Sequence, residues 1–391
     1  MPPKIIFLIT EDRFLWSHRL PIARAALHSG YEVIIATRVV GDGQKILDEG
    51  FRLIPLSLKR RSYNPLRDLG VIRHLREIYK TEKPDIVHHV ALKPVLYGTA
   101  AALGFKDIRV INALTGLGFL VSSNSAKARF LRPIIWNLFR LLLSRTNQHV
   151  LLQNRDDMQL LVTRLKVSSE KIVTIRGSGV NVDLFQPSPE PPGTPIVLFA
   201  SRMLWIKGLR EFVTAARLLR NKGVKARFVL VGDADFGSPS SVPRQQLLEW
   251  QEAGALEWWG HKENMPEVFK QINLICLPSQ GGEGVPKTLL EAAASGRAII
   301  TTNVPGCRDI VRQGVNGILV EPKNATALAA AIEELLNDPE RRQKMGERGR
   351  EIAVGEFSQE QVVKETLSLY SRLLKPGDLS SGMTSSKTSE I

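Results

Sequence analysis

The chain has 391 residues, enough for two domains of ordinary size, and 43% of them are hydrophobic, so each half can bury a core. No apolar run approaches the roughly 18 residues of a membrane-spanning helix, and the two cysteines, Cys276 and Cys307, sit in or beside apolar segments, which argues against a disulfide framework and for a reducing cytoplasm. The net charge is +14, and residues 1–190 carry +12 of it (28 Lys and Arg minus 16 Asp and Glu), so we expect the first half to meet an anionic partner.

The first half of the chain alternates strand and helix. Its opening run, KIIFLIT, is too short for a signal peptide and predicts a first buried strand. Short runs rich in Ile and Val, typical of strands covered on both faces, predict strands over 4–10, 31–37, 52–56, 85–90, 108–114 and 148–152. Helices are expected between them, including 17–29, 66–80 and 127–145.

A Pro-rich segment, 187–195, predicts a linker, after which the alternation restarts. Strands are expected over 195–200, 226–231, 255–259, 273–277, 297–302 and 317–320. The fold class is therefore α/β, with two doubly wound, Rossmann-like domains facing each other across a cleft that holds the ligand. We expect the domains over 1–187 and 195–356, a closing helix over 357–375, and a disordered Ser- and Thr-rich tail over 376–391.

The most informative segment is 278–306, in which a glycine-rich loop joins a strand to a helix. Pro286 suits the first helical turn, and Gly296 suits the C-terminal cap. Free N–H groups at such a helix start attract phosphate. Glu283 lies in the loop, and Glu291 lies roughly 9 Å along the helix from position 285, so two carboxylates can flank a bound diphosphate and accept hydrogen bonds from hydroxyl groups.

Two cations follow the first strand of the second half. Arg202 and Lys207 lie in the segment RMLWIKG, directly after IVLFAS. At the carboxyl end of that strand, both side chains can reach the same crevice. There they would neutralise a diphosphate and stabilise it as a leaving group.

These motifs resemble the retaining glycosyltransferases of family four, which have the GT-B fold of two Rossmann-like domains. The resemblance covers nearly the whole chain and rests on PDIVHHVALKP, NALTGLGF, GSGVNVDLFQP, RMLWIKG, VLVGD, EGVPKTLLEAAASG and FSQEQVVKETLSLYSRLL. It implies transfer of a sugar from a nucleotide donor with retention of configuration and without a metal or other cofactor. It also implies that the closing helix packs back on the first domain.

The resemblance assigns roles in the donor site. Arg202 and Lys207 would bind the donor diphosphate and act in catalysis, Glu291 would hold the ribose hydroxyls, and Glu283 would contact the transferred sugar as a catalytic residue. The backbone from Gly284 through Val285 and Pro286 to Lys287 would cap the phosphates.

The first domain departs from the family in two places. The loop after the first strand, TEDRFLWSHRLP, lacks the usual glycines, and Thr115 stands where many members have a histidine. His88, Lys93, Thr115 and Gly116 are the candidates on the acceptor side, and His89 and His18 are further histidines nearby. The first-domain catalytic residue stays open at this point.

The Asn-x-x-Thr-Gly-Leu-Gly version, with Lys93-Pro94, resembles the subgroup that builds lipid-linked oligosaccharides, capsule or O-antigen units from UDP-hexoses or UDP-N-acetylhexosamines. Its acceptors are linked to undecaprenyl diphosphate. The basic amphipathic segment 127–145 and the cations of 57–80 independently favour an anionic membrane surface as a partner. We therefore expect a peripheral protein on the cytoplasmic face of the cell membrane.

The sequence also offers four other interpretations. Asp233-Ala-Asp235 resembles a metal-binding Asp-x-Asp motif, but it follows a second-domain strand, and no metal is expected. No G-x-G-x-x-G follows the first strand, which argues against a nicotinamide-dependent oxidoreductase. The charge alone would suit a nucleic-acid-binding protein, yet no recognition motif supports one. A GT-B sugar-nucleotide epimerase stays open as an alternative enzyme.

Overall fold

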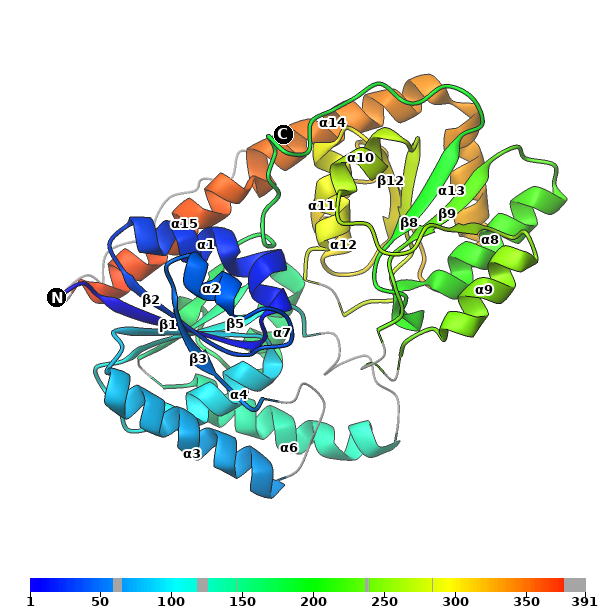
Figure 1. Cartoon of the computed structure of the whole chain (residues 1–391). Helices are drawn as coiled ribbons and strands as arrows, with labels where there is room; N and C mark the ends of the chain where they lie inside the picture. The colour runs from blue at the N-terminus through cyan, green and yellow to red at the C-terminus, as the bar shows by residue number, and fades with distance from the viewer. Residues whose placement is uncertain are drawn as a thin grey trace.

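The computed structural model describes residues 1–58, 65–117, 126–145, 147–235, 238, 240–282 and 284–375, with the backbone alone for 65–67, 126–132 and 134. It contains two parallel β-sheets, each covered by helices and side by side in Figure 1. The predicted tail, 376–391, and Glu283 lie outside the described residues. The α/β fold class with two Rossmann-like halves is confirmed.

The first sheet has seven strands in the order β3-β2-β1-β4-β5-β6-β7, and all its pairings are parallel. Its strands are β1 (Lys4–Glu11), β2 (Glu32–Arg38), β3 (Arg52–Pro55), β4 (Ile86–Val90), β5 (Arg109–Leu114), β6 (Gln148–Leu152) and β7 (Ile172–Thr174). Its helices are η1 (Leu15–Arg19), α1 (Leu20–His28), α2 (Gln44–Asp48), α3 (Pro65–Glu82), α4 (Leu92–Ala101), α6 (Ala126–Leu143), α7 (Arg155–Leu165) and η2 (Ser169–Lys171).

The second sheet has six parallel strands in the order β10-β9-β8-β11-β12-β13. Its strands are β8 (Ile196–Ala200), β9 (Arg227–Val231), β10 (Glu257–Trp258), β11 (Leu274–Leu277), β12 (Ala298–Thr302) and β13 (Gly317–Val320). Its helices are η3 (Trp205–Lys207), α8 (Leu209–Asn221), α9 (Arg244–Glu252), α10 (Met265–Lys270), α11 (Lys287–Ala294), α12 (Cys307–Ile310), α13 (Ala325–Asn337) and α14 (Pro339–Phe357).

Strand β7 and the segment after β1 differ from the sequence prediction. The prediction ended the first sheet at β6 because β7 has only three residues, too few for a clear pattern. The single helix expected over 17–29 is a π-helix, η1, followed by the α-helix α1, which begins beside Pro21. Proline suits the first turn of a helix, so it favours a new helix start there.

The closing helix α15 (Gln359–Leu374) belongs to the first sheet's core. It lies along α1 in Figure 1, and its residues Val362, Leu369, Tyr370 and Leu373 are buried there with those of β1 and α1. The Tyr370 hydroxyl and His88 Nδ1 are 2.6 Å apart, and Arg109 Nε donates to the Leu373 carbonyl at 3.2 Å. The resemblance implied this packing.

The chain passes between the two sheets at two neighbouring segments. Val180 N–H donates to the Phe357 carbonyl at 2.9 Å, and Gln359 N–H donates to the Val180 carbonyl at 2.8 Å. The Pro-rich segment that follows is fixed to the second sheet's side: Arg297 donates to the Ser188 carbonyl, and Arg342 pairs with Glu190. The two crossings are therefore paired with each other rather than joined by a free linker.

Candidate functional site

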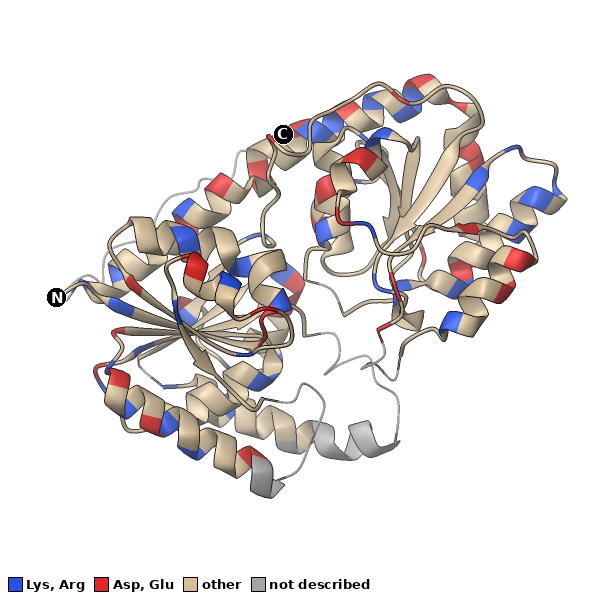
Figure 2. Ribbon diagram, in the orientation of Figure 1, with Lys and Arg blue, Asp and Glu red and all other residues tan. Residues whose placement is uncertain are grey.

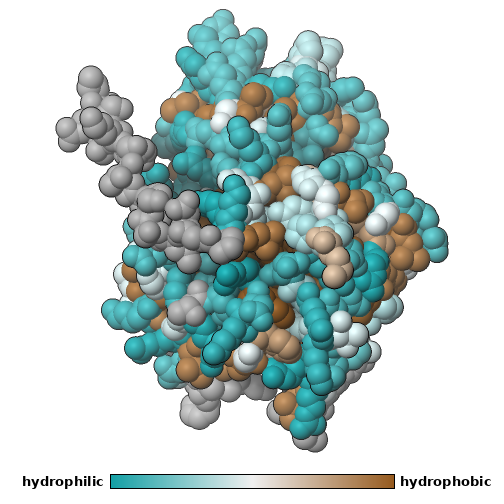
Figure 3. All heavy atoms as spheres, turned by 90° about the vertical axis from the view of Figure 1, so that its left-hand side faces the viewer, coloured by the Kyte–Doolittle hydropathy of each residue, from teal (hydrophilic) through white to brown (hydrophobic). Residues whose placement is uncertain are grey.

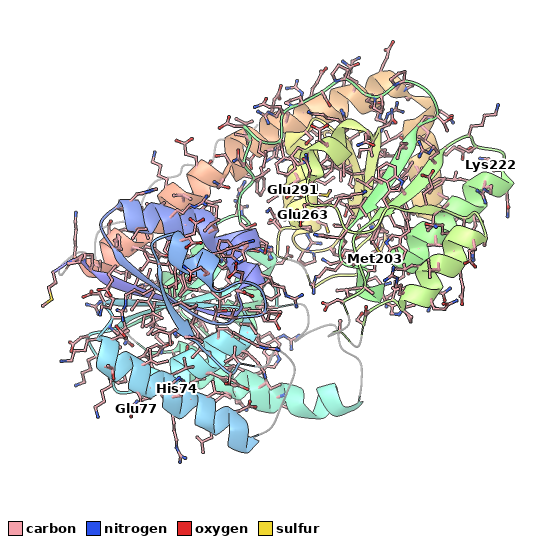
Figure 4. The ribbon with its side chains drawn as sticks, in the orientation of Figure 1. His74, Glu77, Met203, Lys222, Glu263 and Glu291 are labelled. Carbon is pink, nitrogen blue, oxygen red and sulfur yellow. The ribbon has the colours of Figure 1, made fainter. Side chains whose placement is uncertain are left out.

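The predicted donor residues that the structure describes lie at the carboxyl edge of the second sheet. Arg202 lies two residues beyond β8, and Lys207 ends the short helix η3. The glycine-rich loop follows β11 and leads into α11, whose residue Glu291 lies on the part of the second domain nearest to the first (Figure 4). Parallel strands bring such loops together because all their carboxyl ends share one edge.

The Lys207 segment is packed directly on the glycine-rich loop. Gln280 N–H donates to the Ile206 carbonyl at 2.8 Å. Gly208 has φ +80, and a β-carbon there would lie 1.9 Å from the Pro278 carbonyl oxygen. Only glycine lets the backbone at 208 come this close to Pro278. The close contact between the two segments keeps Lys207 beside the loop.

The glycine-rich loop has the backbone that its composition predicts. Gly281 and Gly282 have φ +121 and +81, values that side chains disfavour. Gly296, with φ +69, follows the end of α11 as expected for a terminating glycine. Pro286 is the residue before α11 rather than in its first turn, because the helix begins at Lys287. Glu291 is therefore one turn into the helix, about 6 Å from its start.

A cluster of positive charge from both domains surrounds His18. Burial, together with the charges of Arg19, Lys287, Arg202 and Lys207, lowers the pKa of His18 from 6.5 to about 3. His18 comes from η1 of the first domain, while the last three cations come from the second. Arg202, Lys207 and Lys287 thus all lie within electrostatic reach of His18, and the imidazole is neutral at pH 7.

Arg202 is oriented by Asp235. Its Nη1 donates to Asp235 Oδ2 at 2.7 Å, and Asp235 is buried while Arg202 is partly exposed. Asp235 belongs to the Asp-x-Asp segment that the sequence suggested as a metal motif. Within the described ranges no group of three His, Cys, Asp or Glu side chains is arranged to hold a metal.

Lys287 connects α11 to the first domain. Its Nζ donates to the Ser17 carbonyl of η1 at 3.0 Å and lies 3.6 Å from Glu291 Oε1. Its side chain thus bridges the cleft, a role that the sequence did not predict. The resemblance had assigned only its backbone to the site.

The acceptor-side candidates separate into two groups. Thr115 and Gly116 lie at the cleft, and a β-carbon on Gly284 would lie 2.8 Å from the Thr115 carbonyl oxygen. Lys93 is buried at the start of α4, with its Nζ 5.5 Å from the Tyr97 ring centroid. His88, in contrast, has no exposed surface and contacts Tyr370 of α15.

The burial of His88 corrects its proposed contact with an acceptor. It lies on the face of β4 that α15 covers, and its ring stacks on Phe7 at 5.2 Å. His89 is likewise fully buried, between Tyr79 and Asn112. Both histidines hold the first domain together, which the sequence could not distinguish from a site role because strands buried on both faces leave no polar side to compare.

Gln153 is a site residue that the sequence analysis missed. It directly follows β6, and its Oε1 accepts a hydrogen bond of 3.4 Å from the Val285 N–H of the second domain. The available signal was its position: a polar side chain at the carboxyl end of a buried strand.

Residues 4–154 match a family model described as glycosyl transferase 4-like, and residues 182–352 match one described as glycosyl transferases group 1. The chain belongs to these glycosyltransferases, and its fold is GT-B. The family excludes the oxidoreductase and nucleic-acid-binding interpretations.

Relatives of this glycosyltransferase match along the whole chain. It is 28% identical over 385 residues to the N,N'-diacetylbacillosaminyl-diphospho-undecaprenol alpha-1,3-N-acetylgalactosaminyltransferase of Campylobacter jejuni, covering 95% of this chain and 99% of the relative. It is 27% identical to the putative glycosyltransferase EpsD of Bacillus subtilis, covering 95% and 97%. The structure of Anabaena HepE in complex with UDP-glucose has a TM-score of 0.76 at 17% identity, covering 94% and 99%.

The stability of the Glu291→Gln variant relative to the wild type should increase as the pH rises. Burial raises the pKa of Glu291 to about 7 from 4.5, against the influence of Lys287. The folded state therefore binds this proton more tightly than the unfolded chain does. The stabilisation due to the bound proton is complete below about pH 4.5 and is lost as the pH rises through 7. Between pH 5 and 8 the variant should gain on the order of 2 kcal/mol over the wild type.

Urea unfolding at pH 5 and pH 8 measures this difference. Glu252→Gln, at the exposed end of α9, is the matched control and should show the same stability difference from the wild type at both pH values. A Glu291→Gln difference that does not change with pH would contradict the effect of burial on Glu291.

Proposed function

We propose that this glycosyltransferase moves a hexose or N-acetylhexosamine from a UDP-sugar to a saccharide carried on an undecaprenyl-type lipid diphosphate, in the synthesis of cell-surface polysaccharide. The observation that carries the donor half is the convergence of Arg202, Lys207 and Lys287 beside the loop that starts α11. Such a cation cluster suits a diphosphate. The Campylobacter relative, named for a diphospho-undecaprenol substrate, supports the acceptor half.

In the proposed reaction the donor diphosphate is the leaving group. Arg202, held by Asp235, and Lys207 would neutralise the charge that develops on it. The N–H groups at the start of α11 would bind its oxygens, and Glu291 would accept hydrogen bonds from the ribose. Glu283, beyond the described residues, is proposed to contact the transferred sugar.

We propose transfer with retention and without a metal. The leaving diphosphate would take the proton of the acceptor hydroxyl as that hydroxyl attacks from the same face, so the chain's own contribution is positioning and charge stabilisation. Thr115, Gly116 and Lys93 are proposed to contact the acceptor. His18, neutral and beside the cations, replaces His88 as the proposed first-domain histidine of the site.

A thermal-shift panel of nucleotide sugars tests the donor. The panel contains UDP-glucose, UDP-galactose and their N-acetylated forms, with GDP-mannose as a contrast. The UDP-sugars should raise the Tm, the matching donor most of all, because a ligand that binds the folded state stabilises it. A result in which no UDP compound raises the Tm would contradict the proposal. Analysis of products without acceptor distinguishes the alternative, a sugar-nucleotide epimerase. Full turnover in excess chelator tests metal independence.

We propose that the membrane surface is formed by the basic amphipathic segment 127–145, which contains most of α6, and by the cations of 57–80. Only some apolar side chains of α6 are available for contact with lipid. Ile135, Trp136 and Phe139 pack into the core, whereas Leu138 and Leu141 are 43% and 67% exposed. Figure 3 shows a mainly hydrophilic face with apolar side chains in separate patches, and Figure 2 shows Lys and Arg on helices of both domains. Of the helices described, none is long and apolar enough to cross a membrane.

Flotation with vesicles tests this surface. Vesicles that contain anionic lipid should carry the protein upward at low salt, and neutral vesicles should not, because the attraction is mainly electrostatic. Absence of binding to anionic vesicles at any modest salt concentration would refute the surface and, with it, the proposed peripheral location on the inner face of the cell membrane.

A further inference from the structure

The glycine-rich loop of the second domain lies directly against the first domain. An ideal β-carbon on Gly284 would lie 1.9 Å from Gln153 Oε1 and 2.8 Å from the Thr115 carbonyl oxygen. Gln153 and Thr115 follow the neighbouring strands β6 and β5. The space that any other residue at 284 would need is therefore occupied by two oxygen atoms of the opposite domain.

Gln153 supplies the polar contact in this interface. Its Oε1 accepts the Val285 N–H at 3.4 Å, and both residues are buried, with 4% and 6% of their surface exposed. A buried N–H that loses its acceptor costs free energy. This cost favours the orientation of the Gln153 side chain toward the loop and the contact between the loop and the first domain.

We infer that Gln153 is a positioning residue for donor binding, acting from the domain opposite to the one that carries the other donor residues. By holding the Gly284–Val285 backbone, it sets where α11 begins, and hence where the N–H groups of its first turn face a phosphate. This inference rests on the proposed function. The inference adds to the proposed function that a first-domain residue influences donor affinity. The donor site is then complete only while the two domains are in contact.

The substitution Gln153→Met tests the inference, because methionine has similar reach but cannot replace the amide oxygen as an acceptor. Two measurements are compared with the wild type: amide hydrogen exchange of the peptide that contains Val285, and UDP affinity by isothermal titration calorimetry. We expect faster exchange and about ten-fold weaker UDP binding. Gln153→Glu, which keeps an oxygen acceptor of the same reach, should retain wild-type exchange and gives a second folded variant.

Gln148→Met is the matched control. Gln148 is also a buried glutamine, at the opposite end of the same strand, where it accepts from Asn112 Nδ2 within the first domain. Its loss should lower the Tm about as much as Gln153→Met but leave UDP affinity and Val285 exchange unchanged.

Unchanged exchange in Gln153→Met would overturn the inference, as would faster exchange with wild-type UDP affinity. If the wild type itself binds no UDP, the proposed function fails. The exchange measurement then still decides whether Gln153 holds the loop.

Discussion

Replacing Lys207 by alanine is expected to lower kcat/KM by about 100- to 1000-fold, the loss seen when one preorganised charge-stabilising group is removed. Lys207 is fixed beside the glycine-rich loop by the Gln280–Ile206 hydrogen bond, and its charge reaches the same place as those of Arg202 and Lys287. Removing it leaves the diphosphate less neutralised both when bound and as it departs. Donor affinity and turnover should therefore fall together.

Lys222→Ala is the matched control for Lys207→Ala. Lys222 caps the far end of α8, remote from Glu291 in Figure 4, and pairs with Glu333 on the surface. Steady-state kinetics should show wild-type activity for this variant, because surface ion pairs contribute little. Wild-type activity in Lys207→Ala would refute the assignment of Lys207 to the diphosphate.

Gly208→Ala is expected to destabilise the second domain by more than about 3 kcal/mol. The substituted residue would combine a positive φ with a β-carbon 1.9 Å from the backbone oxygen of Pro278, and backbone cannot move aside as a side chain can. To relieve the clash, η3 must separate from the glycine-rich loop, so Lys207 would also lose its position. Urea unfolding and UDP titration measure the two effects.

Gly223→Ala provides the comparison for Gly208→Ala. Gly223 has nearly the same φ, +84, but nothing lies within 4 Å of the added β-carbon. It should cost only about 1 kcal/mol, the usual penalty for a side chain in this conformation. Equal losses in the two variants would mean that the contact with Pro278 has no energetic consequence.

The sequence predicted every strand except β7 closely, because parallel strands buried on both faces have short, continuous apolar runs. Strand β4, expected over 85–90 and found at Ile86–Val90, is an example. The same pattern hid the role of His88, because burial on both faces gives no hint of which face a closing helix covers.

The candidate site was predictable where its residues are close in sequence. Gly281 to Glu291 form one local motif, and Gly208 with Lys207 forms another. The contacts of Gln153 with Val285, and of Lys287 with Ser17, join residues 132 and 270 positions apart. No local pattern encodes such pairs, because they arise only from the way the two domains face each other.

The path of α15 has a consequence for how the protein can be divided. The first domain's core includes Val362, Leu369 and Tyr370, so a fragment that ends at residue 187 would leave one face of α1 and the His88 imidazole uncovered in water. The second domain, by comparison, runs continuously along the chain. We therefore expect that it can be exchanged between relatives as one continuous segment. An exchange of the first domain would have to include both the N-terminal half of the chain and α15. On the proposed assignment of the donor to the second domain, recombination among such enzymes should change donor preference more readily than acceptor preference.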